Sequence, residues 1–233
     1  MKLEEIIKNF RLNSEKRDLI INGDNVKEES NKDEYVPEPF KKIAKCILSG
    51  HFKVTEGNKV VRRVYPTCVE IYYHEEAEDA IKDYIVYHRN KGDKSPGIFC
   101  SGSFNTHQSG IDITFEHRDH NGNIVRASAL IREYKMVDER IDKEGSPLYV
   151  KNKKVDNRST YLYEALFADL SIIKGFSIQW VDGEDNGEKD TEMTAPTYRK
   201  NVLPHNEKGK IEKDKDGKIF KNDGRCWQFS RKD

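Results

Sequence analysis

A β-prone run over residues 62–74 constrains the fold of this chain more than any other segment. It reads Arg62-Arg63-Val64-Tyr65-Pro66-Thr67-Cys68-Val69-Glu70-Ile71-Tyr72-Tyr73-His74, and β-branched and aromatic side chains of this kind favour strands. Successive side chains of a strand point to opposite faces. Val69, Ile71 and Tyr73 therefore share the face that reaches a core, and we expect Glu70 to look out from the other face beside Tyr72.

Hydrophobic period and turn residues predict the remaining elements. Pro37 and Pro39 open a helix that Gly50 ends, and Asp119-His120-Asn121-Gly122-Asn123 is the turn of a hairpin. Further helices are expected over residues 3–10, 75–87 and 160–170, and strands over 59–73, over 110–136 on both sides of that turn, and over 176–181. These elements predict an α+β fold, a single domain with a mostly antiparallel, curved sheet and flanking helices.

The charge pattern indicates how the chain is divided. Residues 1–35 are expected to form an N-terminal helix and a charged connector, and residues 36–233 the domain. Mobile loops are expected near 182–194, which is acidic, and near 205–222, where Lys208 to Lys221 alternate with acids in a solvated hairpin or loop. The terminal Trp227 and Phe229 are expected to dock back on the core.

The composition limits the partners that the chain can bind and the cellular compartment that suits it. Lys plus Arg equals Asp plus Glu at 41 each, so any basic surface must be local. No stretch approaches the ~20 apolar residues of a membrane span, and the N-terminus carries no apolar leader, so no membrane partner is expected. The four cysteines form no Cys-x-x-Cys pair, which favours reduced thiols in a cytoplasmic protein. The oligomeric state is not predicted.

Several motifs follow the Glu70 strand in order. They are Pro96-Gly97-Ile98-Phe99, Gly102-Ser103-Phe104, Ser109-Gly110, Ala129-Leu130-Ile131-Arg132, Ala195-Pro196-Thr197-Tyr198-Arg199 and Arg225-Cys226-Trp227-Gln228-Phe229. With Val69-Glu70-Ile71-Tyr72, they resemble the motifs of the alkyladenine (3-methyladenine) DNA glycosylase family over roughly residues 60 to 230. The resemblance implies that family's fold. It also implies a DNA-repair hydrolase that cleaves the N-glycosidic bond of a damaged base, with DNA or a nucleotide as partner.

The resemblance also implies roles for single residues. Glu70 takes the place of the catalytic base that activates water, Tyr72 that of the stacking platform, and Arg132 that of a cleft arginine. One carboxylate can both aim a water at the anomeric carbon and stabilise the developing oxocarbenium ion, so no metal or cofactor is required. Tyr73 and Phe104 are further candidates for stacking on the base, and His88 is a displaced counterpart of the family's cleft histidine.

One motif departs from the family at the position of its intercalating tyrosine, which is Ser109 here. Phe104 and His107 lie close enough along the chain to be candidates for the missing wedge. Without such a wedge, the substrate would be single-stranded or a free nucleotide, or catalysis would be lost. A non-catalytic domain that binds nucleic acid or protein on the same scaffold is therefore the main alternative function.

Other interpretations of the same residues stay open. Tyr72 can be a half-buried strand aromatic, and Arg132 can form an ion pair with Glu133 or Asp112. A metal-dependent hydrolase is a third possibility, because acidic and histidine side chains crowd into one hairpin: His107, Asp112, Glu116, His117, Asp119 and His120. No glycine-rich phosphate-binding loop follows a strand, so no cofactor is predicted.

Overall fold

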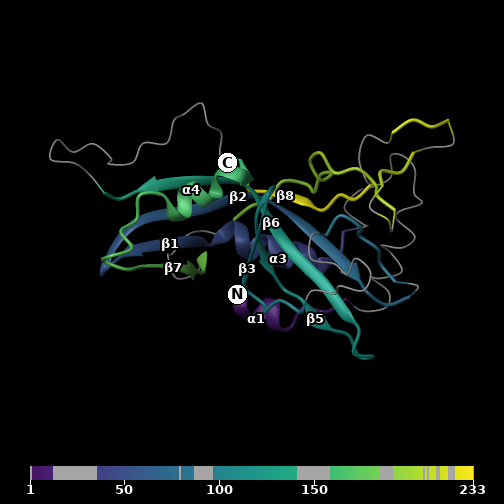
Figure 1. Ribbon diagram of the computed structural model, residues 1–233, viewed down its shortest axis with the longest axis horizontal. Coiled ribbons are helices and arrows are strands. Elements are labelled where there is room, and N and C mark those ends of the chain that lie inside the picture. Colours follow the sequence, from purple (N-terminus) through teal and green to yellow (C-terminus); the bar gives the residue numbers. More distant parts are fainter. Residues whose placement is uncertain are drawn as a thin grey trace.

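The predicted strand over residues 59–73 is the central strand of an antiparallel sheet. It is β2 (Lys59–Glu75), and it pairs along almost its whole length with β6 (Ile124–Asp138). The computed structural model describes residues 2–12, 36–78, 80–86, 97–140, 158–183, 191–206, 208, 210–213, 216–219 and 224–232. Within them, the sheet is strongly curled, and it runs in the order β3-β4-β6-β2-β1-β7 (Figure 1).

The outer strands are short, and the hairpin predicted over residues 110–136 describes only some of them. β3 (Phe104–His107), β4 (Gly110–Thr114) and β5 (His117–Arg118) precede the predicted turn, and β5 pairs with the start of β6. β7 (Phe176–Val181) has the bounds expected for it. β1 (His51–Glu56), which pairs with both β2 and β7, was not predicted.

A bulge in the middle of β2 changes the partner on one of its edges. The register against β6 shifts between Pro66 and Val69, where proline has no N–H to give to the ladder. Before the bulge, β1 lies against β2, and after it the C-terminal strand β8 (Gln228–Ser230) pairs with Cys68, Val69 and Glu70. The bulge therefore admits the end of the chain beside Glu70.

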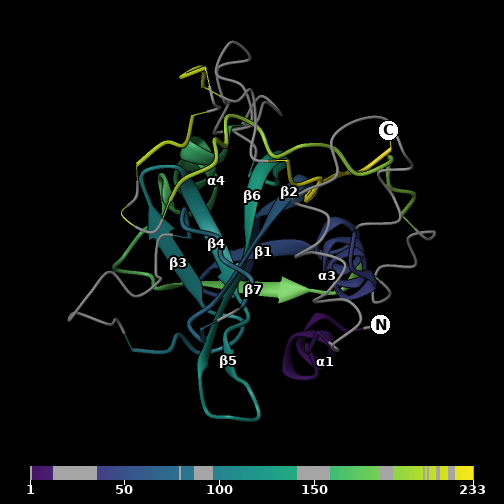
Figure 2. The ribbon, with the colours of Figure 1, turned by 90° about the vertical axis from the view of Figure 1, so that its right-hand side faces the viewer.

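The core lies between the sheet and two helices on one side of it. These are α1 (Leu3–Lys8) and α3 (Glu38–Ser49), which lie together in Figure 2. The α3 helix buries Phe40, Ile43, Ala44, Ile47 and Leu48, the i, i+3, i+4 pattern of one helix face. As predicted, it follows Pro37 and ends at Gly50. A side chain at Gly50 would meet the Trp180 ring 2.3 Å from its Cβ, so only glycine fits there.

The C-terminal aromatic pair docks as expected. Trp227 and Phe229 are 3% and 1% exposed, and the Trp227 ring packs edge-on against Phe40 with 5.1 Å between centroids. The third helical region is shorter than the expected 160–170, because a 3-10 turn η1 (Ser159–Tyr161) leads into α4 (Leu162–Phe167). The carbonyls at the end of α4 are bound by Arg62, which is fully buried.

The helix predicted over residues 75–87 is wrong for the part of that range the structure describes, residues 75–78 and 80–86. Glu75 still belongs to β2, and the following residues form turns. Side chains hold the amide groups that a helix would use: the Ile81 N–H donates to the Glu75 carboxylate, and the Asp83 N–H donates to His74 Nδ1.

Several expectations fall on residues outside the described ones. These are the connector over 13–35, the residue His88, the centre of the acidic loop at 184–190, and parts of the lysine-rich segment. No helix among the described residues is long and apolar enough to cross a membrane.

Candidate functional site

Glu70 does not look out from the sheet, and the expectation of an exposed carboxylate is wrong. The residue lies between Leu130 of β6 and Gln228 of β8, and its exposed fraction is 0%. The cover comes from the segment 197–203, which is distant in sequence and bonds to this face of β2. A pattern of alternating residues within one strand carries no information about such a distant cover.

Three donors bind the Glu70 carboxylate. The Lys200 N–H donates to Oε1 over 2.6 Å, and Arg132 Nε lies 3.3 Å from the same oxygen. The Tyr72 hydroxyl donates to Oε2 over 2.9 Å. Arg132 thus forms an ion pair with Glu70, instead of the alternative pair with Glu133 or Asp112. Each oxygen of the buried acid has a donor, as a buried charge requires.

Burial changes the acid–base properties of this strand face. It raises the pKa of Glu70 above its usual range, although Arg132 and the Lys200 amide oppose the effect. It raises the pKa of Tyr72 well above its usual value, so that hydroxyl stays protonated and able to donate. Burial also raises the pKa of the Cys68 thiol to about 11, which keeps this cysteine from acting as a thiolate nucleophile at neutral pH.

A second buried ion pair holds the covering segment in place. Arg199 Nη1 and Nη2 lie 2.7 Å and 3.2 Å from the two carboxylate oxygens of Asp83, and Nη1 also donates to the Ile71 carbonyl. The guanidinium lies over the rings of Tyr72 and Trp227, at 4.6 Å and 5.2 Å from their centroids. Burial acts to raise the pKa of Asp83, but the Arg199 and Arg225 guanidinium groups lower it below its usual range.

Tyr72 lines a cavity of about 560 Å³, which we call the Tyr72 cavity. Its wall combines apolar and polar side chains, among them Tyr84, Val86, Leu130, His107, Asp112 and Arg132. This volume is within the range of small-molecule sites, about 300–1,000 Å³. Glu70 is not part of the lining: it lies behind Tyr72 and Arg132, which it binds through their polar atoms.

The polar side of the Tyr72 cavity is organised around Asp112, which is 3% exposed. Its carboxylate lies 3.1 Å from His107 Nε2 and accepts hydrogen bonds from Ser128 Oγ and Asn105 Nδ2. His107 Nδ1 in turn accepts the Ser109 N–H. His107 is therefore oriented with its Nε2–H toward Asp112, and this cluster forms a fixed set of polar groups at the cavity wall.

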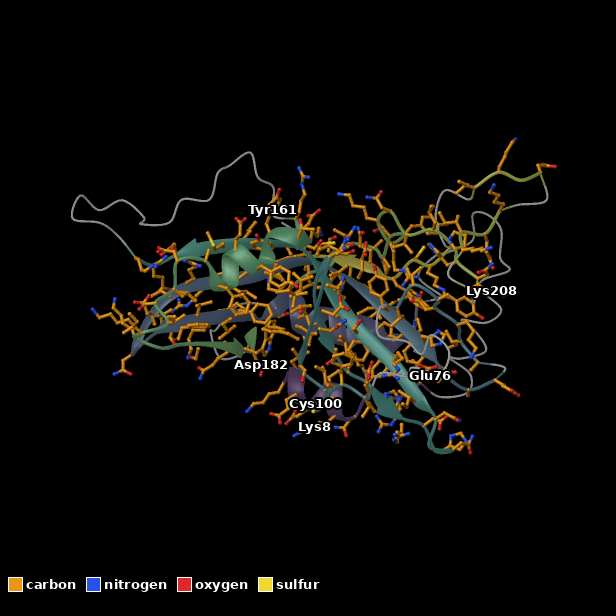
Figure 3. The ribbon with its side chains drawn as sticks, in the orientation of Figure 1. Lys8, Glu76, Cys100, Tyr161, Asp182 and Lys208 are labelled. Carbon is orange, nitrogen blue, oxygen red and sulfur yellow. The ribbon has the colours of Figure 1, made fainter. Side chains whose placement is uncertain are left out.

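A second cavity of about 690 Å³ adjoins the first, and we call it the basic cavity. The two share Arg132, Ser159, Thr160, Lys200 and Asn201 in their linings, so these residues divide them. Tyr161, which follows Thr160, marks this upper part of the molecule in Figure 3. The basic cavity has five cationic residues in its lining against one acid, Glu133; the cations are Arg132, Lys135, Arg158, Lys200 and Arg231.

The structure brings together only part of the predicted site. Tyr72, His107 and Arg132 line the Tyr72 cavity with Ser109, and Glu70 lies behind it. Tyr73 lies on the opposite face of β2, where it contacts Phe10 and Phe40 and its hydroxyl donates to Glu75. Phe104 packs edge-on against Phe52, beside a different, apolar cavity.

The metal site considered for the hairpin around residues 107–120 is not formed by the described residues. Among the described residues, no three His, Cys, Asp or Glu side chains lie close enough to hold a metal ion. Asp112 binds His107, whereas Glu116 binds Arg126 over 3.0 Å at a separate buried site. The side chain of Asp119 bonds to the backbone of its own turn.

Sequence reasoning missed Asp83, Arg199 and the Lys200 amide. Asp83 falls in the range predicted to be a helix, where an acid reads as part of a solvated face. Arg199 is the last residue of the motif Ala195-Pro196-Thr197-Tyr198-Arg199, which assigns it no role. The backbone N–H of Lys200 is common to almost every residue, so no sequence pattern marks it. A buried ion pair between residues more than a hundred positions apart leaves no local pattern.

Comparisons with protein family models, with curated proteins and with solved structures find no match to this chain.

Proposed function

We propose that this chain binds a nucleotide unit of a nucleic acid, with the base in the Tyr72 cavity and phosphate in the basic cavity. One observation carries the proposal: an aromatic and polar cavity adjoins a strongly basic one, and Arg132, Lys200 and Asn201 divide the two. A nucleotide has the same two-part chemistry. Its base offers a flat face and hydrogen-bonding edges, and its phosphate offers negative charge that Lys and Arg bind.

The Tyr72 cavity has the groups that a nucleobase requires. Tyr72 and Leu130 provide aromatic and apolar surface, and the polar cluster of His107, Asp112 and Ser128 provides donors and acceptors for the edge of a base. The cavity lacks an aromatic side chain at Ser109, where the resembling family has its wedge. This favours single-stranded nucleic acid, whose bases are already accessible, over a closed duplex.

Cleavage of the glycosidic bond is the second candidate function, and Glu70 favours it. The carboxylate lies directly behind Tyr72 and Arg132, and burial raises its pKa, as is common for groups with acid–base roles. This candidate requires the Lys200 amide to move from Glu70 so that a water can reach the acid. It also implies that the curled sheet is that of the alkyladenine DNA glycosylases, as the order of the motifs supports.

The test is binding of labelled single-stranded oligonucleotides, measured by fluorescence anisotropy over a series of salt concentrations. The double variant Lys135→Gln/Arg158→Gln removes two cations of the basic cavity. We expect weaker binding and a slope of log affinity against log salt that is smaller by about 0.7 for each cation removed. The control Lys53→Gln/Lys59→Gln removes the same charge from β1 and β2, from residues that line neither cavity, and is expected to bind as the wild type does.

The same oligonucleotides, carrying alkylated or deaminated bases, separate binding from hydrolysis. If Glu70 is the catalytic base, Glu70→Gln abolishes base release while binding persists. Binding without release in the wild type leaves the non-catalytic function. Equal losses in the cavity and control variants, or no saturable binding, would contradict the proposed nucleotide site.

A further inference from the structure

The strand β7 forms one edge of the sheet. All six of its residues pair with β1, and no described strand pairs with its other side. In Figure 1, it runs along the lower margin of the sheet, below β1. In such a strand, alternate residues point their N–H and C=O groups away from the one neighbour. β7 therefore presents a row of backbone donors and acceptors at the side of the molecule.

This edge lacks the features by which proteins prevent strand pairing. Natural edge strands carry charged residues, prolines or bulges that block a further strand. The β7 sequence Phe-Ser-Ile-Gln-Trp-Val has no charge and no proline, and its register with β1 is unbroken. The neighbouring turn adds exposed apolar surface, since Ile172 and Ile173 are 84% and 93% exposed. An edge strand of this kind is a template for pairing with a further strand.

We propose that β7 pairs antiparallel with β7 of a second copy of this chain, about a twofold axis at Ile178. Residues directly opposite in an antiparallel pair lie on the same face of the sheet. The inner face of one β7 therefore continues into the inner face of the other, and the outer face into the outer face. On the inner face, Ile178 lies opposite Ile178 of the second copy, and Trp180 lies opposite Phe176. On the outer face, Gln179 lies opposite Ser177. Apolar residues thus meet apolar residues, and polar residues meet polar ones.

The two ends of β7 limit this register to the strand itself. Lys174 precedes β7 in a turn, and Gly175 has a φ of +72°, so the extended backbone that can pair about Ile178 begins at Phe176. Lys174 contacts Glu56 on its own chain, and Asp182, at the end of β7 (Figure 3), accepts hydrogen bonds from the Leu3 N–H and from Trp180 Nε1. The formal net charge of the whole chain is +0, so two copies do not repel each other at long range. The second copy is therefore complementary to β7 in the polarity of the residues that face each other.

The outer-face pair of Ser177 and Gln179 provides the test. In Ser177→Lys/Gln179→Lys, the twofold axis sets Lys opposite Lys twice. In Ser177→Lys/Gln179→Glu, it sets Lys opposite Glu twice. Both variants lose the hydrogen bond between Ser177 and Thr55, which is 2.8 Å long, so any effect of that loss on folding is shared. They differ in the charge at position 179, which decides whether the facing side chains repel or attract, and therefore by two units of net charge per chain.

Sedimentation equilibrium of the full chain measures the outcome. We expect the wild type to have the mass of two chains, the Lys/Lys variant to dimerise at least about tenfold more weakly, and the Lys/Glu variant to remain dimeric. A monomeric wild type at every concentration would overturn the proposal. Equal dissociation constants for the two variants, with circular dichroism showing both folded, would overturn it as well, because the facing charges would then not meet.

Discussion

At the scale of the residue, Glu70 shows how a strand acid can be buried. Its two flanking aliphatic residues face the core, so its own face is the one that strand geometry leaves open. The segment around Lys200 closes that face and gives the carboxylate a backbone donor, while Arg132 and Tyr72 give it two side-chain donors. The carboxylate is therefore buried with a partner for each of its oxygens, although it contacts two residues, Tyr72 and Arg132, that line a cavity.

The first prediction at this scale concerns the pH dependence of stability. A carboxyl group with a higher pKa in the folded than in the unfolded chain binds protons on folding, so its contribution to stability falls as pH rises through the folded pKa. Glu70 is such a group. We expect Glu70→Gln to remove that fall, so that the unfolding free energy of the variant improves relative to the wild type as the pH rises from the unfolded pKa, about 4, through the folded one.

Urea unfolding at a series of pH values measures this difference. Glu133→Gln is the matched control, since it removes one carboxylate from an exposed position on β6. Glu133 lies three residues beyond Leu130, the residue that pairs with Glu70. The control removes one carboxylate from the same pair of strands without touching the buried one. Parallel profiles for the wild type and Glu70→Gln would show that Glu70 titrates alike in both states, and the burial argument would fail.

At the scale of the element, the segment 197–203 depends on the pair between Asp83 and Arg199. This segment has no regular secondary structure, so its position is set by side chains and by the short bridge between Thr197 and Gln228. Asp83 also contacts Arg225, at 3.4 Å, and accepts the Tyr73 N–H. One acid thus joins β2, the segment that covers Glu70 and the approach to β8.

Replacing that acid is expected to destabilise the protein strongly. Asp83→Asn leaves Arg199 buried without its counter-charge, and loss of one partner of a buried ion pair typically costs about 3–5 kcal/mol. The matched control is Asp169→Asn, which removes the acid of a pair between Asp169 and Arg140. Asp169 is 66% exposed, and surface pairs of that kind contribute about 0–1 kcal/mol.

The cost of Asp83→Asn should depend on pH in a defined direction. Because the folded pKa of Asp83 is lowered, its contribution is present above the unfolded pKa and disappears as the pH falls through the folded pKa. The gap between wild type and Asp83→Asn, measured by urea unfolding, should therefore narrow on acidification. A gap that is small at neutral pH, or one that matches that of Asp169→Asn, would contradict the assigned role.

At the scale of the whole molecule, the parts that sequence predicted are those encoded by neighbouring residues. Period-two alternation located β2, the hairpin and β7, and proline and glycine marked the ends of α3. The errors arose where hydrogen bonds outside the periodic pattern decide the structure. His74 and Glu75 bind amides that a helix over 75–87 would have used, and Lys200 covers a face of β2 that alternation assigns to solvent.

The same contrast explains why the candidate site was found only in part. Tyr72 lies opposite Ser128 of β6, and Arg132 lies four residues further along β6 at the bulge, so both belong to two strands that the sequence predicted. Phe104 was placed in the cleft by its nearness in sequence to Ser109, but β3 pairs with β4 and turns that ring toward Phe52. Which face an aromatic ring takes depends on the register of a short strand, and four residues do not specify it.

The docking of the C-terminus gives the last prediction, because the molecule closes its core with its final strand. Phe229 is 1% exposed and lies opposite Val69 in the pairing of β8 with β2. Removing a buried phenylalanine typically costs about 3–5 kcal/mol, so Phe229→Ala should lower the unfolding free energy by that amount. Phe104→Ala is the matched control, since the same ring is removed from a half-buried position beside a cavity, where the loss should be smaller.

Urea unfolding followed by circular dichroism distinguishes the two variants. If Phe104→Ala were as costly as Phe229→Ala, the end of the chain would not close the core. If Phe229→Ala is the costlier variant, β8 stabilises the sheet beside the Glu70 site. The final residues would then support both the core and the cleft, because β8 pairs with the strand that carries Glu70 and bridges to the segment that covers it.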